Sequence, residues 1–300
     1  MSASFTTALT VEEALAAVAS GARPVAGGTD LVVGARQGKA ALPDTIVAID
    51  RLPELGRIAA GADGGLEIGA GVTHAALLGS AAVCDRYAAL GDACAIVGSH
   101  ATRAHGTIGG NVMNASPAMD TGGPLLCFGA LAVLASNEGT RSLPLDELWL
   151  GPGRTAAQAN ELLVSLSLPP QPERSGSCYV RLEYRRQMEI AVVGVTAAVA
   201  VGAGRIESAR VAITALTPTI RRVRSAEDLL VGTEAGEPAI RAAAAAVAAE
   251  ATPISDVRAS AEYRQAMAER IARRAILGAL RRASGERVAI PASDTLFATD

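Results

Sequence analysis

Two adjacent glycines interrupt the stretch Arg23-Pro24-Val25-Ala26-Gly27-Gly28-Thr29-Asp30-Leu31, which decides how the chain folds. A short predicted strand over 23–26 leads into the glycines, and the hydroxyl and carboxylate that follow can cap the next helix. Because glycine has no Cβ, backbone amides in such a loop can approach a phosphate closely. The dipole of the following helix also favours negative charge at this point. The alternative is an ordinary turn from strand to helix.

The same pattern returns in Gly106-Thr107-Ile108-Gly109-Gly110-Asn111. Polar residues follow it through Ser116-Pro117 to Asp120. Two such loops can close on one pyrophosphate from opposite sides, with backbone amides and threonine hydroxyls as donors. Asn111 and Asp120 can then hold sugar hydroxyls. The alternative is a pair of unrelated glycine loops.

A third glycine motif, Gly151-Pro152-Gly153-Arg154-Thr155-Ala156, matches the dinucleotide fingerprint G-x-G-x-x-A. Its second position is a proline and no βαβ unit surrounds it, so we expect no Rossmann site there. The three histidines lack H-E-x-x-H spacing, and the chain has no G-x-S-x-G elbow and no G-x-x-x-x-G-K-[ST] loop. We therefore assign no catalytic residue. Electron transfer fits such a chain, because a bound cofactor then carries the chemistry.

Composition excludes several classes of protein. Half of the 300 residues are apolar, 19% are charged, and the net charge of −3 gives no basic footprint for nucleic acid. The amino terminus carries Glu12 and Glu13 where a signal peptide needs apolar residues. The longest apolar stretch, 190–204, is shorter than the roughly 20 residues of a membrane span. The four cysteines are dispersed, which favours buried thiols over a metal site. We expect a cytoplasmic protein without a membrane span or a metal of its own.

The proline-rich segment 169–172 marks a domain boundary. Before it we expect an α/β subdomain over 1–55 and a second subdomain over 56–172, with one helix over 81–97 and an irregular glycine-rich segment over 99–123. Thr10 followed by Glu13 is a capping box that predicts a helix start, and Asp63-Gly64-Gly65 predicts a β-hairpin. After the prolines, three β runs precede three helical stretches: the runs cover 177–184, 190–201 and 205–216, and the helices cover 226–231, 237–250 and 260–282. This order predicts an α+β domain over 173–285, with helices on one face of an antiparallel sheet. We expect residues 286–300 to form a frayed tail.

Together these motifs resemble the FAD-binding medium subunit of molybdenum hydroxylases, the group of xanthine dehydrogenase, carbon monoxide dehydrogenase and 4-hydroxybenzoyl-CoA reductase. The resemblance rests on the two glycine loops with Ser116-Pro117 and Asp120. It also rests on the stretch from Tyr179-Val180-Arg181 to Arg185-Arg186-Gln187-Met188-Glu189-Ile190-Ala191, and on Asp256-Val257-Arg258-Ala259-Ser260-Ala261-Glu262-Tyr263-Arg264. It covers residues 5 to 283.

The resemblance implies two FAD-binding subdomains of the p-cresol methylhydroxylase type, followed by the carboxy-terminal α+β domain. FAD would lie between the subdomains, with its diphosphate on the two loops. In this chain an arginine stands at 181 where the family usually has lysine, and Glu189 stands where aspartate is common. The cofactor-binding residues implied are Pro24, Val25, Ala26, Gly27, Gly28, Thr29, Asp30, Leu31, Gly98, Thr102, Gly106, Thr107, Ile108, Gly109, Gly110, Asn111, Asp120, Leu163 and Arg181.

The resemblance also implies partners. A large subunit would carry the molybdenum–pterin cofactor, and a small subunit would carry two [2Fe–2S] clusters, assembled as a dimer of heterotrimers. Electrons would pass from the clusters through FAD to NAD⁺ or to another acceptor such as a quinone, a cytochrome or oxygen. Two alternatives stay open: a stand-alone FAD oxidoreductase acting on a small molecule, and a scaffold subunit without a cofactor.

Overall fold

The computed structural model describes residues 4–38 and 40–297, and the chain forms two compact units. The first unit comprises 1–76, 100–115 and 130–170, and the second comprises 77–99, 116–129 and 171–300. The sequence of each unit is therefore discontinuous. The last division, between Pro170 and Gln171, falls inside the proline-rich segment. The subdomain limits 1–55, 56–172 and 173–285 stay a prediction.

The first unit begins with a small parallel sheet of order β1-β3-β2. Thr10 caps helix α1, since its Oγ1 accepts from the N–H of Glu13 at 3.2 Å, as the sequence predicts. The strand at 4–7 was not predicted, because its residues are exposed and its pairing partner lies far along the chain. The elements are β1 (Ser4–Thr7), α1 (Val11–Ala19), β2 (Arg23–Val25), α2 (Thr29–Arg36), β3 (Thr45–Ala48) and a 3₁₀ turn, Pro53–Gly56.

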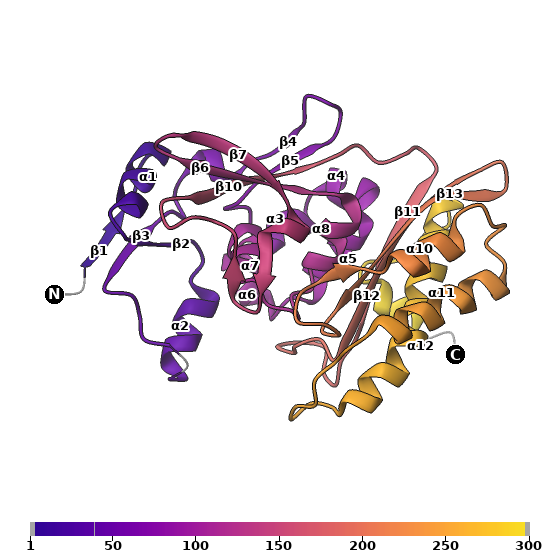
Figure 1. The fold of residues 1–300 in the computed structure, drawn as a ribbon. Helices are drawn as coiled ribbons and strands as arrows, with labels where there is room; N and C mark the ends of the chain where they lie inside the picture. Colours follow the sequence, from indigo (N-terminus) through magenta and orange to yellow (C-terminus); the bar gives the residue numbers. More distant parts are fainter. Residues whose placement is uncertain (1–3, 39, 298–300) are drawn as a thin grey trace. The chain divides into compact units, whose positions relative to one another are not determined.

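A five-stranded antiparallel sheet of order β4-β5-β10-β6-β7 completes the first unit (Figure 1). The turn at 61–65 is the hairpin that the sequence predicts, with Gly64 at φ +83°. Helix α3 (His74–Leu78) leads out of this unit. The strands of this sheet are β4 (Ile58–Ala60), β5 (Leu66–Gly69), β6 (Leu131–Ser136), β7 (Gly139–Pro144) and β10 (Leu162–Leu168). A separate antiparallel pair is formed by β8 (Trp149–Gly151) and β9 (Arg154–Thr155), and the helices are α6 (His100–His105), α7 (Ile108–Asn114) and α9 (Leu145–Leu148).

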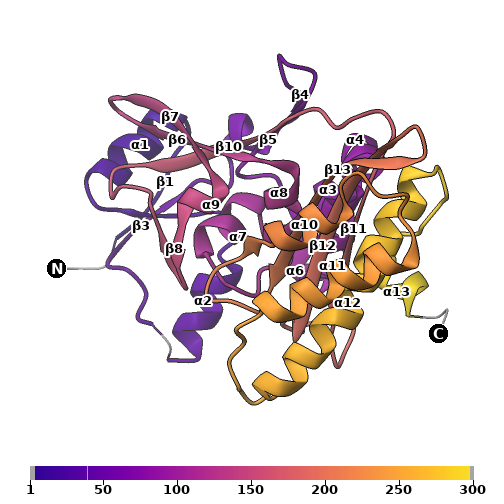
Figure 2. The same ribbon diagram turned by 45° about the vertical axis from the view of Figure 1, so that its right-hand side comes forward.

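The second unit is built on an antiparallel sheet of order β11-β12-β13-β14, which contains the three predicted β runs. The three predicted helices follow as α10, α11 and α12, and they cover one face of this sheet (Figure 2). The strands are β11 (Ser175–Leu182), β12 (Val193–Gly202), β13 (Arg205–Thr214) and β14 (Arg221–Arg222), and the helices are α4 (Ala81–Arg86), α5 (Ala88–Ile96), α8 (Gly122–Phe128), α10 (Arg224–Leu230), α11 (Glu237–Glu250), α12 (Ala261–Ala283) and α13 (Ala292–Leu296).

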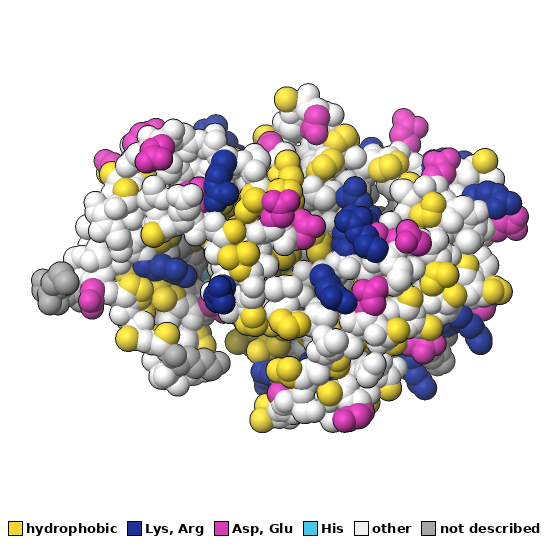
Figure 3. All heavy atoms as spheres, in the orientation of Figure 1, with side chains coloured by type: hydrophobic (Ala, Val, Ile, Leu, Met, Phe, Trp, Pro, Cys, Tyr) yellow, Lys and Arg dark blue, Asp and Glu magenta, His cyan; other side chains and the backbone are white. Residues whose placement is uncertain are grey.

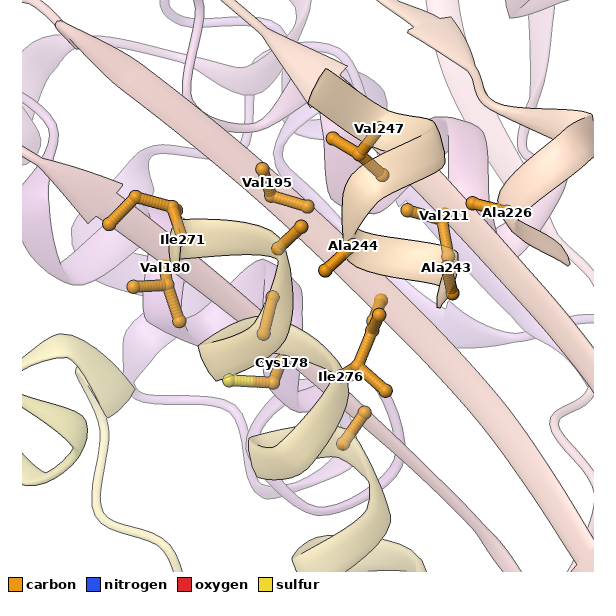
Figure 4. Close-up of a cluster of buried hydrophobic side chains, with 14 of the residues drawn as sticks. Cys178, Val180, Val195, Val211, Ala226, Ala243, Ala244, Val247, Ile271 and Ile276 are labelled. Atoms are coloured by element: carbon orange, nitrogen blue, oxygen red, sulfur yellow. The ribbon is translucent and has the colours of Figure 1, made fainter. Parts of the chain in front are cut away.

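The main core of the second unit lies between the sheet and α10–α12 (Figure 4). Alternate residues of β12, such as Val195, point toward Ala244 and Ile271 of the helices. The opposite face of β12 is covered too, because Thr196 lies directly against Gly123 of α8. The three helices that the sequence predicts for 173–285 thus lie on one face, as expected, and the other face is covered from outside that range. The helix on the second face comes from residues that precede the sheet in sequence.

Three further local predictions differ from the structure. The helix predicted over 81–97 is broken at Tyr87 into α4 and α5. The segment 99–123 forms the short helices α6 and α7 and the start of α8, since tertiary contacts stabilise helices too short to show periodicity. The described part of the predicted tail is not frayed throughout, because Ala292 and Leu296 of α13 are buried; residues 298–300 lie outside the description.

No helix within residues 4–38 and 40–297 is both long enough and apolar enough to cross a membrane. On the face drawn in Figure 3, acidic and basic side chains are interspersed and neither sign forms a continuous patch. Three of the four cysteines are buried, as the sequence predicts, and Cys84 is half-buried.

Candidate functional site: two glycine loops in contact

The first glycine loop ends β2 and begins α2. Gly28 is the N-cap of α2 at φ +64°, a left-handed conformation that glycine adopts without strain. Thr29 and Asp30 therefore lie inside the first turn, whereas the sequence predicts that they precede the helix as caps. The first intrahelical bond runs from the N–H of Val32 to the carbonyl of Gly28. The amides of residues 29–31 precede that bond, so the helix itself offers them no acceptor.

The two loops meet at Gly27. A Cβ atom on Gly27 would lie 1.9 Å from the carbonyl oxygen of His105 and 3.0 Å from the amide nitrogen of Gly106. A Cβ on Gly106 would in turn lie 3.4 Å from Oγ1 of Thr29. The backbones of both loops are thus packed together so closely that Gly27 has no room for a Cβ, whereas a Cβ on Gly106 would be in ordinary contact with Thr29. This convergence of two segments distant in sequence is what the sequence predicts.

The second loop begins α7 with a capped N-terminus. Oγ1 of Thr107 accepts from the N–H of Gly110 at 3.1 Å. The amides of Ile108 and Gly109 donate to the carbonyls of Val72 and Ala70, both at 2.9 Å, and Asn111 donates to Thr107. The sequence predicts these amides as donors to a ligand, but in this structure each already has an acceptor within the protein.

The glycines of the second loop differ in what surrounds them. A Cβ on Gly109 would lie 2.5 Å from Cβ of Ala70, so this glycine allows α7 to pack against the end of β5. Gly110 is exposed, and a Cβ there would meet only Oγ1 of Thr107, at 3.1 Å. Packing within the protein therefore requires Gly109, whereas Gly110 keeps an outer surface of the loop free of side chains.

The buried residue His74 is hydrogen-bonded to the second loop. The backbone N–H of His74 donates to the carbonyl of Gly106 at 3.0 Å, and the residue is only 2% exposed. Burial, followed by the nearby charge of Arg103, lowers the pKa of His74 to about 4. The imidazole is consequently neutral near pH 7. His105, at the end of α6, is exposed.

Two other predicted residues of the first unit, Thr102 and Leu163, contact neighbouring parts of the protein. The carbonyl of Thr102 accepts from the N–H of Gly106 at 2.7 Å. Leu163 is buried in β10 beside Leu134 of β6. The third glycine motif forms the antiparallel pair β8–β9, so the prediction that it is no Rossmann loop is confirmed.

Three predicted residues belong to the second unit, and two of them form one buried cluster. Nη1 of Arg181 donates to Oδ2 of Asp120 at 2.8 Å. Nη2 of Arg181 contacts a carboxylate oxygen of Glu183. The hydroxyl of Tyr179 donates to Oδ1 of Asp120 at 2.7 Å. The guanidinium of Arg181 thus bridges two carboxylates inside the unit, and its side chain is 0% exposed.

Burial dominates the electrostatics of this cluster. It raises the pKa of Asp120, although Arg181 and the hydroxyl of Tyr179 act in the opposite direction. It also raises the pKa of Glu183, against the effect of Arg181. Removing the guanidinium would leave two carboxyl groups in a desolvated site without a counter-charge.

Glu189 lies in the loop that precedes β12, and Gly98 contacts that loop. The carbonyl of Gly98 accepts from the N–H of Met188 at 2.9 Å. The carboxylate of Glu189 pairs with Arg185 at 3.2 Å, and its backbone carbonyl accepts from Arg181 at 3.4 Å. The side chain of Glu189 is thus committed to neighbours within the second unit.

Sequence reasoning missed Tyr179 as a partner of Asp120. A signal was present, because Tyr179 and Arg181 are two residues apart on a predicted strand and so share one face of the sheet. It also missed His74, for which the sequence holds no comparable signal, since the contact with Gly106 is made across the fold.

The chain is similar in sequence to known proteins over nearly its whole length. Residues 1–171 match the family described as FAD binding domain in molybdopterin dehydrogenase, and residues 179–279 match the CO dehydrogenase flavoprotein C-terminal domain. The xanthine dehydrogenase FAD-binding subunit of Escherichia coli O157:H7 is 29% identical over 287 residues, covering 95% of this chain and 98% of the relative. The carbon monoxide dehydrogenase medium chain of Afipia carboxidovorans is 31% identical over 263 residues, covering 87% and 90%.

Solved structures agree with these matches. A chain of the reconstituted CO dehydrogenase from Oligotropha carboxidovorans superposes with a TM-score of 0.89 at 29% identity, covering 94% of this chain and 99% of that one. A chain of quinoline 2-oxidoreductase from Pseudomonas putida 86 gives 0.87 at 27% identity, covering 94% and 98%. The predicted fold class is confirmed. The chain belongs to the FAD-binding family of the molybdopterin dehydrogenases, a family of oxidoreductase subunits.

Proposed function

We propose that this chain is the electron-transfer subunit of a molybdenum hydroxylase complex and holds FAD with its diphosphate at the two glycine loops. The observation that carries the proposal is the contact at Gly27, where a Cβ would lie 1.9 Å from the carbonyl oxygen of His105. Such packing brings two turns of backbone to one place without side chains between them. FAD, when bound, would accept and pass on electrons.

The residues of the first loop fit the diphosphate of this cofactor. The amides of Thr29 and Leu31 lie in the first turn of α2, where the helix supplies no acceptor, and the positive end of the helix dipole lies at the same place. These are the donors that a diphosphate requires. Because the amides of the second loop already donate to protein acceptors, the first loop would supply most of the backbone hydrogen bonds.

The second loop would contribute its shape and its side chains. Gly110 leaves the surface of α7 open at its N-terminal turn, so a bulky ligand can approach the backbone there. Asn111, next to it, is half-exposed and would hold a sugar hydroxyl. Pro24, Val25 and Ala26 would shape the first loop rather than donate to the ligand, and Leu31 would contribute only its backbone amide. The roles of Gly98, Thr102, Leu163, Asp120 and Arg181 at the cofactor remain proposals from the family resemblance.

The same proposal includes two partner subunits. A large subunit would hold the molybdenum–pterin cofactor and a small one the [2Fe–2S] clusters, with electrons passing through FAD to NAD⁺ or another acceptor. Support comes from the matched relatives, which are named as FAD-binding subunits or medium chains of dehydrogenases. A dimer of heterotrimers is the assembly proposed.

Reconstitution with FAD tests this function directly. The purified chain, incubated with FAD and passed through a desalting column, should retain about one flavin per chain, with the visible absorbance bands of bound flavin. Ferricyanide, which oxidises reduced flavins, should reoxidise the flavin after dithionite reduction. A chain that stays colourless, while its circular dichroism shows it folded, would overturn the proposal.

A further inference from the structure

The third glycine motif, residues 151–156, forms a β-hairpin rather than a dinucleotide-binding loop, and this hairpin contacts α7. Residues 149–155 form β8 and β9, and Gly153 takes φ +69° in the turn between them. Trp149, the only tryptophan in the chain, is 5% exposed and is the first residue of β8. Its neighbour Leu150 is 57% exposed. One face of the hairpin is therefore packed inward and the other faces solvent.

The inward face is hydrogen-bonded to the C-terminal end of α7. The indole Nε1 of Trp149 donates to the carbonyl of Val112 at 3.1 Å. The N–H of Gly153 donates to the carbonyl of Ala115, the C-cap of α7, also at 3.1 Å. The carbonyl of Val112 also accepts from the N–H of Ala115 at 3.1 Å, so Trp149 is a second donor to it. The hairpin thus adds two hydrogen bonds at this end of the helix.

The other end of α7 is held by different elements. The amides of Ile108 and Gly109 donate to the backbone at the end of β5, as described above. A helix of seven residues is too short to be stable by itself, so these tertiary contacts determine where it lies. Its first turn contains Gly110 and follows Thr107. The orientation of the second loop thus depends on both ends of α7.

We propose that Trp149 is a positioning residue for the cofactor loop: through its bond to Val112 it orients α7 and so sets the surface at Gly110 against which the diphosphate lies. This inference rests on the proposed function of the two loops. It gives the third glycine motif a role in the same site, at the opposite end of the helix from the ligand. Trp149 itself would not touch the cofactor.

Substitution of Trp149 by phenylalanine tests the inference, because it keeps an aromatic ring and removes the indole donor. We expect the dissociation constant of FAD, measured by titration of flavin fluorescence, to rise by up to about five-fold. That limit is the effect of one net hydrogen bond, because the bond of Trp149 lies within the protein and acts on FAD only through the orientation of α7. The matched control is Leu150→Ala, on the same strand but exposed, which should bind FAD as the wild type does. A residue that only stabilised the fold would lower the melting temperature and leave the dissociation constant unchanged.

A second measurement removes the donor alone. Since Trp149 is the sole tryptophan, growth of a tryptophan auxotroph on benzothienylalanine replaces only this indole N–H by sulfur. The same rise in the FAD dissociation constant is expected, even if Trp149→Phe fails to fold. Unchanged FAD binding by the labelled protein would overturn the inference and leave the proposed function intact. Failure of the wild-type chain to bind FAD would instead overturn both.

Discussion

Substitution of Gly27 by alanine probes the contact on which the site depends. The new Cβ would lie 1.9 Å from the carbonyl oxygen of His105, and real Cβ atoms essentially never approach a neighbour within 3.0 Å. The two loops must then separate by about 1.1 Å, because the obstacle is backbone rather than a flexible side chain. Overpacking of this kind costs about 1 to 3 kcal/mol, and we expect a loss of about 2 kcal/mol or more in the free energy of unfolding.

The same displacement should weaken FAD binding. Hydrogen bonds lengthened by about 1 Å are largely lost, so a ligand held by both loops would keep contacts with only one. We expect the dissociation constant of FAD to rise at least about ten-fold, equivalent to about 1.4 kcal/mol. Urea unfolding followed by circular dichroism measures the first effect, and titration of flavin fluorescence measures the second.

Gly34→Ala is the matched control for this experiment. Gly34 lies in α2, a few residues beyond Gly27, and a Cβ there would meet nothing within 4 Å. Alanine at a helical position with open space around its Cβ should stabilise the protein by up to about 1 kcal/mol without affecting FAD. If Gly27→Ala has the same free energy of unfolding and the same FAD dissociation constant as the wild type, the two loops are not held together by this contact.

Three further substitutions test separate parts of the site. Gly110→Val should leave the circular dichroism spectrum unchanged and abolish retention of FAD on a desalting column; normal flavin content would argue against a diphosphate at this surface. Arg181→Met should lower the free energy of unfolding in urea by about 3 to 5 kcal/mol, because it leaves the buried carboxylate of Asp120 and the half-buried one of Glu183 without a counter-charge; a loss below about 1 kcal/mol would contradict the cluster. The pKa of His74 is 6.5 in the unfolded chain and about 4 in the folded protein. Its contribution to the free energy of unfolding should therefore be fully present above pH 6.5 and should fall by about 3 kcal/mol as the pH drops to 4 and below. The variant His74→Gln should flatten that decline, and an equally steep pH profile would exclude His74 as its cause.

Much of the fold follows from local patterns. The capping box at Thr10, the hairpin around Gly64 and the three long β runs of the second unit all appear where the sequence predicts them. Each is determined by residues close together in the chain, by capping or turn chemistry or by period-two alternation. The short helices between 99 and 123 follow no such pattern, because packing rather than intrinsic propensity stabilises them.

The candidate site could likewise be predicted from the sequence only in part. Paired glycines mark both loops in the sequence, since backbone that packs against backbone leaves no room for a side chain. Their individual roles are not visible there. Gly27 and Gly109 are required by packing, whereas Gly110 is exposed, and the difference comes from His105 and Ala70.

Residue types and short spacings were enough to predict the family, the two glycine loops and the α+β character of the carboxy-terminal half. The acceptors of the second-loop amides, the carbonyls of Ala70 and Val72, could not be predicted, because they belong to a distant part of the chain. The bridge that Arg181 forms between Asp120 and Glu183 could not be predicted either. The physical reason is that hydrogen bonds and ion pairs form between atoms close in space, and the chain brings such atoms together only after it has folded.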